Sequence, residues 1–476
     1  MIVKNPNEIK GSPFVIIGGG PAGCAAALAA IQEGWNDILI IEKEPYGRHR
    51  IGEILLTQTV LEMKELGVAD EMHEFAEKFE WGRKYAAAYV NGKDRKPWRV
   101  QNNHPLASEE DQPHIPRSYI NKDTGIWYTL MVRRHEFDES LREVCERRGV
   151  KIVHAAVKSV QWLNEDSQEE TALARMEIEL LDSKERVVLR PKFTIDASGQ
   201  NAVLPRSMNV RQKLEDWNFQ ARYTYYKDVD FSEAIKKGFY KEGANILSFE
   251  DGWVWIAYLG RGLTSVGVVS QHWDKDNDNY FTKIAQLPEY QLFGFDKAEV
   301  VDCYGEPCSQ KNFYAHHNYR YRSTKLRGSN WVCAGDAAMF LDPLLSQGVT
   351  LAMSFGAQAG RMASHVLNGE WDPVEASRKY EDMYINELEV LNKVVSLWYN
   401  KDFNFDEYWV DTAQKINKLF GRNIGDDVEA FRWVSNLENI HYIFRDKHDR
   451  RFLANLNDVN NIKAIHDFEK DGLKDF

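Results

Sequence analysis

The first residues whose types and spacing indicate chemistry are Gly18, Gly20 and Gly23, which follow a short apolar run over residues 14–17. An Ala-rich stretch comes next and ends at Gly34, so the segment predicts a strand, a tight turn and a helix. Gly18 permits the turn, Gly20 leaves room for the backbone to approach a pyrophosphate, and Gly23 lets the helix pack close to its strand. The amino end of that helix then faces the phosphates.

Glu42 supplies an acid where such a site needs one. It ends a second apolar run over residues 38–41 and follows Gly23 by 19 residues. At the end of a second strand its carboxylate can accept a hydrogen bond from a ribose hydroxyl, which favours FAD or NAD. Glycine clusters also occur in plain turns, but strand, helix and acid coincide here. We therefore interpret the segment, with Ala22 in its turn, as a nucleotide site.

Two later segments favour flavin over nicotinamide. Residues 193–199 predict a strand that runs into a small-residue turn, and residues 331–338 predict another strand that ends in a Gly-Asp pair. In these features the chain resembles the flavin monooxygenase superfamily. The resemblance implies that Asp336 contacts FAD and that Arg134 reaches the cofactor. The alternatives are a helix N-cap for Asp336 and an ordinary solvated arginine for Arg134.

Trp253 and Trp255 resemble the W-x-W-x-I-P signature of flavin-dependent halogenases, in which they are thought to shield the flavin. The Ile and Pro positions of that signature carry Ala257 and Tyr258 instead. Both tryptophans would share one face of a strand, so plain sheet packing is the alternative.

Phe340, Pro343, Ser346 and Gly348 match the second halogenase signature, F-x-x-P-x-x-S-x-G, at all four fixed positions. A turn that opens a helix presents backbone N–H groups and a positive dipole end, which suit a halide or an anionic flavin ring. The resemblance implies that the amides of Gln347 and Gly348 hold the halide, that Ser346 belongs to the catalytic group, and that Pro343 and Gly348 also contact the cofactor. Many flavin hydroxylases carry a similar turn.

Lys84 is the expected catalytic lysine. In phenol and pyrrole halogenases such a lysine precedes a run of small residues, and Lys84 precedes Ala86, Ala87 and Ala88. If the segment is one strand, Gly82, Lys84, Ala86 and Ala88 share a face, as a cavity wall would. The alternative is a solvated lysine, and the nearby rivals are Lys78, Lys93 and Lys96.

Ile51, Gly52 and Glu53 resemble the family's I-G-E-x-L-L segment, which touches the flavin. The resemblance implies a halogenase that uses FAD in its reduced form, FADH2, with oxygen and a halide as co-substrate. Hypohalous acid would form at the flavin, travel through a tunnel to Lys84 and halogenate an electron-rich aromatic substrate, free or carrier-bound. A separate flavin reductase would supply FADH2. The alternatives are an FAD-dependent aromatic hydroxylase and a flavoprotein without catalysis. The halide, the substrate and the oligomeric state stay open, with a homodimer as one option.

Composition limits the partners. The 476 residues carry 72 acidic against 60 basic side chains and a net charge of −12, which disfavours nucleic acid and anionic membranes. No apolar run is long enough to span a bilayer and the amino terminus lacks the apolar centre of a signal peptide, so we expect a cytoplasmic protein. Five scattered cysteines indicate neither a disulfide framework nor a zinc site, and we expect no metal.

The expected fold class is α/β, with a Rossmann-like FAD-binding domain of the glutathione-reductase and hydroxylase type. A β-sheet substrate domain is interwoven with it, and a helical cap ends the chain. We assign the FAD-binding domain to residues 1–80, 136–200 and 326–374, the substrate domain to residues 81–135 and 201–325, and the cap to residues 375–476. Residues 101–123 are polar, contain three prolines and predict a long excursion.

Overall fold

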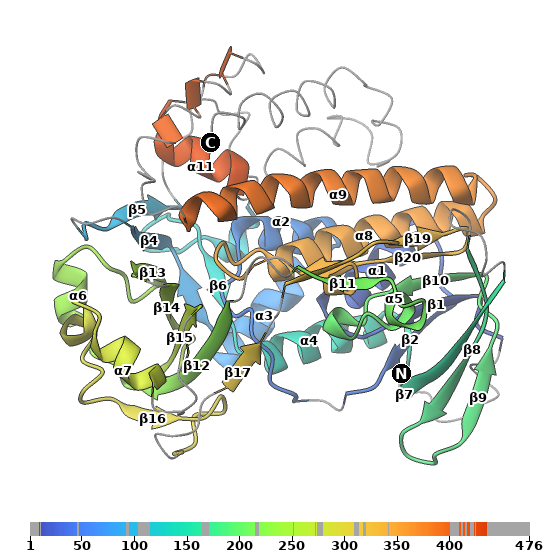
Figure 1. The fold of residues 1–476 in the computed structure, drawn as a ribbon, viewed down its shortest axis with the longest axis horizontal. Coiled ribbons are helices and arrows are strands. Elements are labelled where there is room, and N and C mark those ends of the chain that lie inside the picture. The colour runs from blue at the N-terminus through green and yellow to red at the C-terminus, as the bar shows by residue number, and fades with distance from the viewer. Residues whose placement is uncertain are drawn as a thin grey trace.

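The computed structural model describes part of the chain. The described residues are 9, 11–44, 47–91, 95–102, 115–163, 171–214, 219–250, 252–271, 273, 279–308, 314–317, 320–340, 342–399, 409–410, 413–414, 417–418, 423 and 425–435. Two eight-stranded sheets organise the fold (Figure 1).

The first sheet has five parallel strands at its centre and antiparallel strands at both edges. The central strands β1 and β2 are apolar except for Glu42 at the end of β2, and they are buried on both faces, as parallel strands covered by helices usually are. In spatial order the strands are β19 (Arg327–Gly328), β20 (Trp331–Cys333), β10 (Phe193–Asp196), β1 (Phe14–Ile17), β2 (Ile38–Glu42), β7 (Lys151–Leu163), β8 (Ala172–Leu180) and β9 (Arg186–Leu189).

The helices on this sheet pack closely because their facing residues are small. Helix α1 (Pro21–Gln32) is Ala-rich, and α8 (Gly348–Leu367) crosses it at Gly356 and Gly360. A Cβ at Gly356 would lie 2.2 Å from the Ala22 carbonyl oxygen, and one at Gly360 would lie 2.1 Å from that of Ala26. Also in this half are α4 (Arg134–Arg147), α5 (Val203–Ser207) and two 3-10 turns, η4 (Gly199–Asn201) and η6 (Gly335–Ala337).

The second sheet is mostly antiparallel and carries its own apolar core on each face. Its order is β16 (Glu299–Val301), β12 (Gln220–Lys227), β15 (Leu263–Ser270), β14 (Gly252–Tyr258), β13 (Gly243–Phe249), β4 (Ala86–Val90) and β5 (Trp98–Gln101), with β17 (Tyr314–His317) also paired to β12. Helices α6 (Ser232–Lys236) and α7 (Asn279–Ala285) and the turn η5 (Tyr290–Phe293) lie beside it (Figure 1).

Shorter elements join the two halves. They are α2 (Thr57–Glu65), α3 (Ala69–Phe79), the paired strands β3 (Gly82–Lys84) and β6 (Thr129–Met131), the turn η3 (Arg117–Tyr119), and a small sheet of β11 (Arg211–Lys213), β18 (Tyr321–Ser323) and β21 (Met339–Phe340). The strands of the two large sheets alternate along the chain, as an interwoven fold requires. The boundaries between the FAD-binding domain, the substrate domain and the cap remain predictions.

The long helix α9 (Pro373–Trp398) runs beside α8 (Figure 1). Tyr380 donates a hydrogen bond to the Cys333 carbonyl and Tyr384 donates one to that of Gly335, so the first half of α9 is fixed to the first sheet. Its end reaches the core of the second sheet through Trp398. Helix α11 (Asp427–Ser435) follows, and the predicted cap beyond residue 435 lies outside the described residues, as does most of the predicted excursion. No helix within the described ranges is long and apolar enough to cross a membrane.

Candidate functional site

The glycine turn has the geometry that the sequence predicts. Gly18 has a φ of +106°, and a Cβ there would lie 2.4 Å from the Ala197 carbonyl oxygen. A Cβ at Gly23 would lie 1.9 Å from the Gly18 oxygen, so α1 can approach β1 only with glycine at this position. At Gly20 a Cβ would meet nothing within 4 Å. The turn is therefore tight against the protein on one side and open on the other.

Glu42 braces this turn at the end of β2. Its Oε2 accepts a hydrogen bond of 2.6 Å from the Gly19 N–H, and its Oε1 accepts one of 2.7 Å from the Glu44 N–H. The buried carboxylate thus ties the glycine turn to the next strand, in addition to the ribose contact that the sequence predicts.

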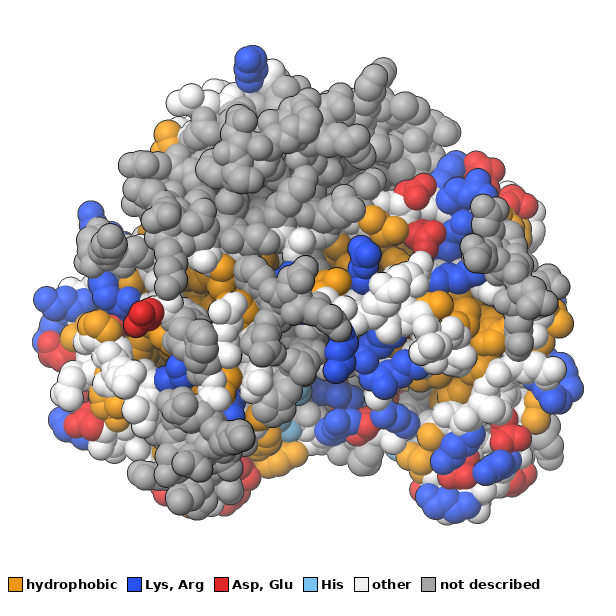
Figure 2. Space-filling model, viewed as in Figure 1, with side chains coloured by type: hydrophobic (Ala, Val, Ile, Leu, Met, Phe, Trp, Pro, Cys, Tyr) orange, Lys and Arg blue, Asp and Glu red, His pale blue; other side chains and the backbone are white. Residues whose placement is uncertain are grey.

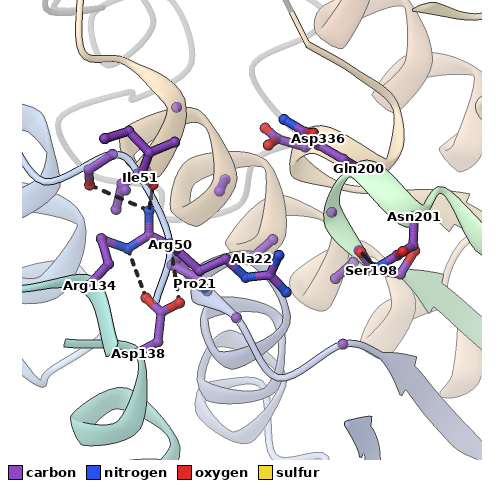
Figure 3. Close-up of a pocket in the computed structure, with 18 of the residues that line it drawn as sticks. Pro21, Ala22, Arg50, Ile51, Arg134, Asp138, Ser198, Gln200, Asn201 and Asp336 are labelled. Carbon is purple, nitrogen blue, oxygen red and sulfur yellow. Dashed lines mark hydrogen bonds and ion pairs between the residues drawn. The ribbon is translucent and has the colours of Figure 1, made fainter. Parts of the chain in front are cut away.

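A cavity of about 420 Å³ opens beside the glycine turn (Figure 3). Its lining continues to Trp253 and Trp255 of the second sheet. Of the predicted site residues, Gly23, Lys84 and Gln347 do not line it. Those that do are Gly18, Gly20, Ala22, Glu42, Ile51, Gly52, Glu53, Arg134, Trp253, Trp255, Asp336, Pro343, Ser346 and Gly348.

Arg134 holds the turn that contains Ile51 and Gly52. Its guanidinium donates a 2.7 Å hydrogen bond to the Ile51 carbonyl and pairs with Asp138 at 3.0 Å (Figure 3). Gly52 has a φ of +103°, and a Cβ there would lie 2.7 Å from Arg134. Arg134 is therefore buried and engaged, and the solvated alternative does not apply.

Arg48 and Arg50 line the cavity although the sequence reasoning did not select them. Burial is the largest cause that lowers the pKa of Arg50, followed by the neighbouring Arg48. Lys and Arg side chains gather near the middle of one face, between the two sheets (Figure 2), although the net charge is −12. Guanidinium groups beside an open glycine turn suit a diphosphate. The basic residues immediately before Ile51 in the sequence could have indicated these two arginines.

Asp336 lines the cavity from η6, after a Gly335 with a φ of +61°. Burial raises the pKa of Asp336 to about 6, while Arg134 and Arg50 oppose the shift. In Figure 3 its carboxyl group lies near Gln200, another residue of the cavity wall.

The turn before α8 leaves the amino end of that helix open to the cavity. Ser346 has a φ of +58°, and its N–H donates to the Pro343 carbonyl at 3.0 Å. A Cβ at Gly348 would meet nothing within 4 Å. Gln347 instead lines a second cavity of about 30 Å³, which Gly348 and Asp336 share. Gly348 therefore borders both spaces.

Both tryptophans of the W-x-W motif are buried in the cavity wall, and each indole N–H has a partner. Trp253 donates to the Tyr399 hydroxyl at 2.7 Å, and that hydroxyl donates to the Asp342 carboxylate at 3.1 Å. Trp255 donates to the Ser265 hydroxyl at 3.1 Å. Trp253 is thus anchored to the end of α9 and, through Tyr399, to the turn before α8, whereas Trp255 is anchored to strand β15. Both also pack in the sheet.

Gly267 makes the position of Trp255 possible. A Cβ at Gly267 would lie 2.0 Å from the Trp255 ring, which rests on the neighbouring strand β15. The sequence alone did not indicate this glycine.

Lys84 lies in β3, is 8% exposed and does not line the cavity. Its Nζ donates to the Leu55 carbonyl at 3.4 Å, and the Thr129 hydroxyl donates to the same oxygen at 2.8 Å. Leu55 belongs to the same segment as Glu53, which lines the cavity. Burial lowers the pKa of Lys84 to about 8. Of the rival lysines, Lys78 and Lys96 are exposed and Lys93 lies outside the described residues.

Residues 82–88 do not form one strand, so the shared face considered for Gly82, Lys84, Ala86 and Ala88 does not arise. The chain changes partners at Tyr85, since β3 pairs with β6 whereas β4 pairs with β13 and β5. Ala87 faces the core that contains both tryptophans, and Ala88 faces the opposite core. Sheet pairing, which is decided by distant strands, sets this break.

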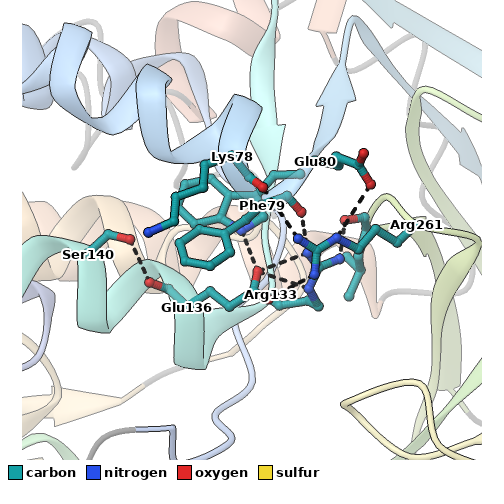
Figure 4. Close-up of polar contacts among 9 residues, drawn as sticks. Lys78, Phe79, Glu80, Arg133, Glu136, Ser140 and Arg261 are labelled. Atoms are coloured by element: carbon teal, nitrogen blue, oxygen red, sulfur yellow. Dashed lines mark hydrogen bonds and ion pairs between the residues drawn. The ribbon is translucent and has the colours of Figure 1, made fainter.

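Arg133 fixes the approach to β3 (Figure 4). Its guanidinium donates to the Phe79 carbonyl at 2.5 Å and pairs with Glu136 at 2.9 Å. The Trp81 indole donates to Glu136 at 2.7 Å, and Arg261 lies 3.7 Å from the same carboxylate. These contacts join α3, α4 and the β14–β15 turn around the start of the lysine-bearing strand.

Comparison with known proteins identifies the family. The model of the tryptophan halogenase family matches residues 13–104 and 106–439. The chain belongs to this family. It is therefore a flavin-dependent halogenase, an oxidoreductase that uses FAD and a halide. The open glycine turn, the braced Glu42 and the two cavity arginines fit this cofactor.

Characterised halogenases resemble the chain over most of its length. A 1H-pyrrole-2-carbonyl-(peptidyl-carrier protein) chlorinase from Pseudomonas fluorescens is 26% identical over 418 residues, which cover 85% of this chain and 87% of the chlorinase. A tryptophan 2-halogenase from Chondromyces crocatus is 26% identical, with 86% and 72% covered. The structure of a halogenase in complex with phloroglucinol and FAD superposes with a TM-score of 0.66 at 15% identity, covering 96% of both chains. The halogenase therefore has a Rossmann-like FAD-binding fold.

Proposed function

We propose that this halogenase forms hypohalous acid beside the flavin and delivers the halogen through Lys84 to an electron-rich aromatic carbon. The observation that carries the proposal is the position of Lys84, buried behind the segment whose Glu53 faces the cavity. Bound FADH2 and oxygen would supply the oxidising equivalents for the halide. The protein's own residues would bind, orient and separate the reactants.

The nucleotide would bind along the glycine turn. Gly18 and Gly23 keep the turn tight against the protein, and Gly20, near Ala22, leaves its other side open. Glu42 would accept a hydrogen bond from the ribose, and Arg50 would pair with the diphosphate. Arg134 positions Ile51 and Gly52 against the flavin region, where Asp336 and Pro343 also lie. Arg134 thus acts on the cofactor mainly through the turn that it holds.

The halide would lie at the amino end of α8. Ser346 in a left-handed conformation turns the chain so that the first N–H groups of the helix point outward, where no side chain follows at Gly348. The positive end of the helix dipole favours an anion. Gln347 would contribute its backbone amide from the side of the smaller cavity.

Trp253 and Trp255 would exclude the organic substrate from the flavin. Their anchored indoles would form an apolar wall that keeps the substrate away from the flavin, so the halogen would meet the substrate at Lys84. The tunnel between the flavin and Lys84 remains a prediction.

Lys84 would hold the halogen because its amine is buried and easily deprotonated. Burial disfavours the charged form, so a neutral amine is accessible slightly above pH 7. We propose a small aromatic substrate, free or carrier-bound, a separate flavin reductase and a cytoplasmic location. The carrier-bound option rests on the similarity to the chlorinase, whose name specifies a carrier-bound pyrrole.

Mass spectrometry of aromatic substrates incubated with the protein, FADH2, oxygen and each halide in turn tests the function. Free phenols and indoles and a carrier-bound pyrrole should be offered in parallel. We expect a halogenated product with at least one halide. Hydroxylated product alone, at every halide concentration, would establish the hydroxylase alternative.

A further inference from the structure

A chain of hydrogen bonds leads away from the cavity into the second sheet. Glu53 lines the cavity, and its carboxyl group accepts a 2.7 Å hydrogen bond from the Tyr225 hydroxyl. That hydroxyl lies 3.1 Å from Nε2 of His49, which is also 3.0 Å from the Tyr223 hydroxyl. Each member can both donate and accept a proton, so the chain is continuous.

Glu53, the inner end of this chain, lines the same cavity as the proposed halide turn and follows a residue that lies against α8. Gly52 lies against the first turn of α8, where a Cβ would be 3.7 Å from Val349. The neighbouring Glu53 is 4% exposed, and its carbonyl accepts a hydrogen bond from the Val132 N–H. Burial raises the pKa of Glu53 to about 7, opposed by its hydrogen bonds to Ser265 and Tyr225. The carboxyl group can therefore hold or release a proton near neutral pH.

The outer end is a partly exposed histidine among aromatic rings. The His49 ring lies 4.5 Å from that of Tyr314 and 5.6 Å from that of Tyr225, measured between centroids. Burial is the largest cause that lowers the pKa of His49 to about 3. The imidazole therefore stays neutral, with one N–H and one lone pair, and can pass a proton by accepting at one nitrogen and donating at the other.

Halogenation consumes a proton, so the cavity needs a supply of protons. FADH2, O2, a halide ion, one proton and an aromatic C–H become FAD, two waters and an aromatic carbon–halogen bond. The flavin gives two electrons and the C–H bond gives two, which together reduce O2 to water. One proton is thus consumed per turnover, although the site must exclude bulk water to protect hypohalous acid.

We propose that Glu53, Tyr225 and His49 form a proton relay that brings this proton to the cavity. The proposal rests on the proposed function. Other titratable or charged groups that face the relay are Arg50, Arg133, Arg134, His135, Cys303, Tyr223, Tyr314 and His316.

The test replaces one hydroxyl group. Tyr225→Phe keeps the ring and removes the link between His49 and Glu53. Tyr226→Phe is the matched control, because Tyr226 is the next residue of the same strand and packs in the opposite core. Single-turnover formation of halogenated product from FADH2-loaded protein is measured between pH 6 and 8, beside FAD affinity.

A second measurement needs no flavin. The infrared carbonyl band of the protonated Glu53 carboxyl group is titrated in flavin-free protein and assigned by its loss in Glu53→Gln. Tyr225→Phe should raise the midpoint above that of the wild type, because a hydrogen bond to the carboxylate is lost. It should also slow product formation about tenfold or more at pH 8 and less at pH 6, with unchanged FAD affinity. Tyr226→Phe should match the wild type in all three.

Three outcomes count against the relay. If Tyr225→Phe forms product at the wild-type rate across the pH range, the relay is refuted, even when the infrared midpoint moves. An unchanged midpoint means that Tyr225 does not contact the carboxylate, and the relay is refuted as well. If the wild type gives no halogenated product with any halide, the proposed function and the relay fail together.

Discussion

Burial of a lysine lowers the free energy of unfolding, and the size of this effect predicts how the stability changes when the lysine is replaced. Lys84→Met replaces the amine by a flexible apolar chain of similar length, in a site where the lysine is 8% exposed. Among the described residues no carboxylate pairs with Lys84, and its Nζ donates to the Leu55 carbonyl at 3.4 Å. We expect the variant to fold, to bind FAD and to oxidise FADH2 under oxygen, yet to lose halogenated product by at least about a hundredfold.

The stability of the variant should rise. Burial lowers the pKa of Lys84 from 10.5 to about 8, which corresponds to about 3 kcal/mol. Between pH 8 and 10.5 the unfolded chain binds a proton that the folded chain does not, so wild-type stability increases with pH across that window. The advantage of Lys84→Met is therefore full below pH 8 and vanishes by about pH 10.5. At pH 7 we expect a gain of about 1–3 kcal/mol, because packing is not perfectly restored.

Urea unfolding of the flavin-free protein at pH 7 and pH 10 measures this gain, and mass spectrometry measures the product. Lys78→Met is the matched control, because Lys78 is exposed at the end of the nearby helix α3 and should change stability by about 0.5 kcal/mol or less. Wild-type halogenation by Lys84→Met would refute the role of Lys84. A loss of stability at pH 7 in Lys84→Met would show that burial of the amine does not destabilise the folded protein.

Three further predictions concern glycines. Gly20→Val should abolish FAD binding without unfolding the protein, since the site is open and a branched side chain would occupy the pyrophosphate's path; undiminished FAD affinity in a folded variant would contradict the nucleotide site. Gly348→Val should remove an anomalous bromide peak at the turn before α8 and suppress halogenation more than FAD binding; a wild-type crystal soaked in bromide with no peak there would overturn the halide site. Gly267→Ala should destabilise the protein by about 1–3 kcal/mol and shift tryptophan fluorescence, because its Cβ would lie 2.0 Å from the Trp255 ring; unchanged emission and melting temperature would show that the ring can move freely.

The sequence determined the local elements of the nucleotide half. Strand, glycine turn, helix and Glu42 lie within 30 residues, so their geometry follows from backbone conformation and periodicity that are local in the chain. The halogenase signatures at Trp253 and Gly348 were also readable, because their spacing within each segment is fixed by one strand or one turn. Membership of the family confirms the fold, the enzyme class and the cofactor that these motifs predicted.

Only the tertiary structure decided which of these segments meet. The break at Tyr85 depends on pairing with β6 and β13, and the burial of Lys84 depends on the Leu55 carbonyl, 29 residues away. Glu53 and Tyr225 lie 172 residues apart and share a hydrogen bond of 2.7 Å. Such contacts leave no periodic trace in the sequence, because they join segments that are far apart in the chain and meet only through tertiary packing.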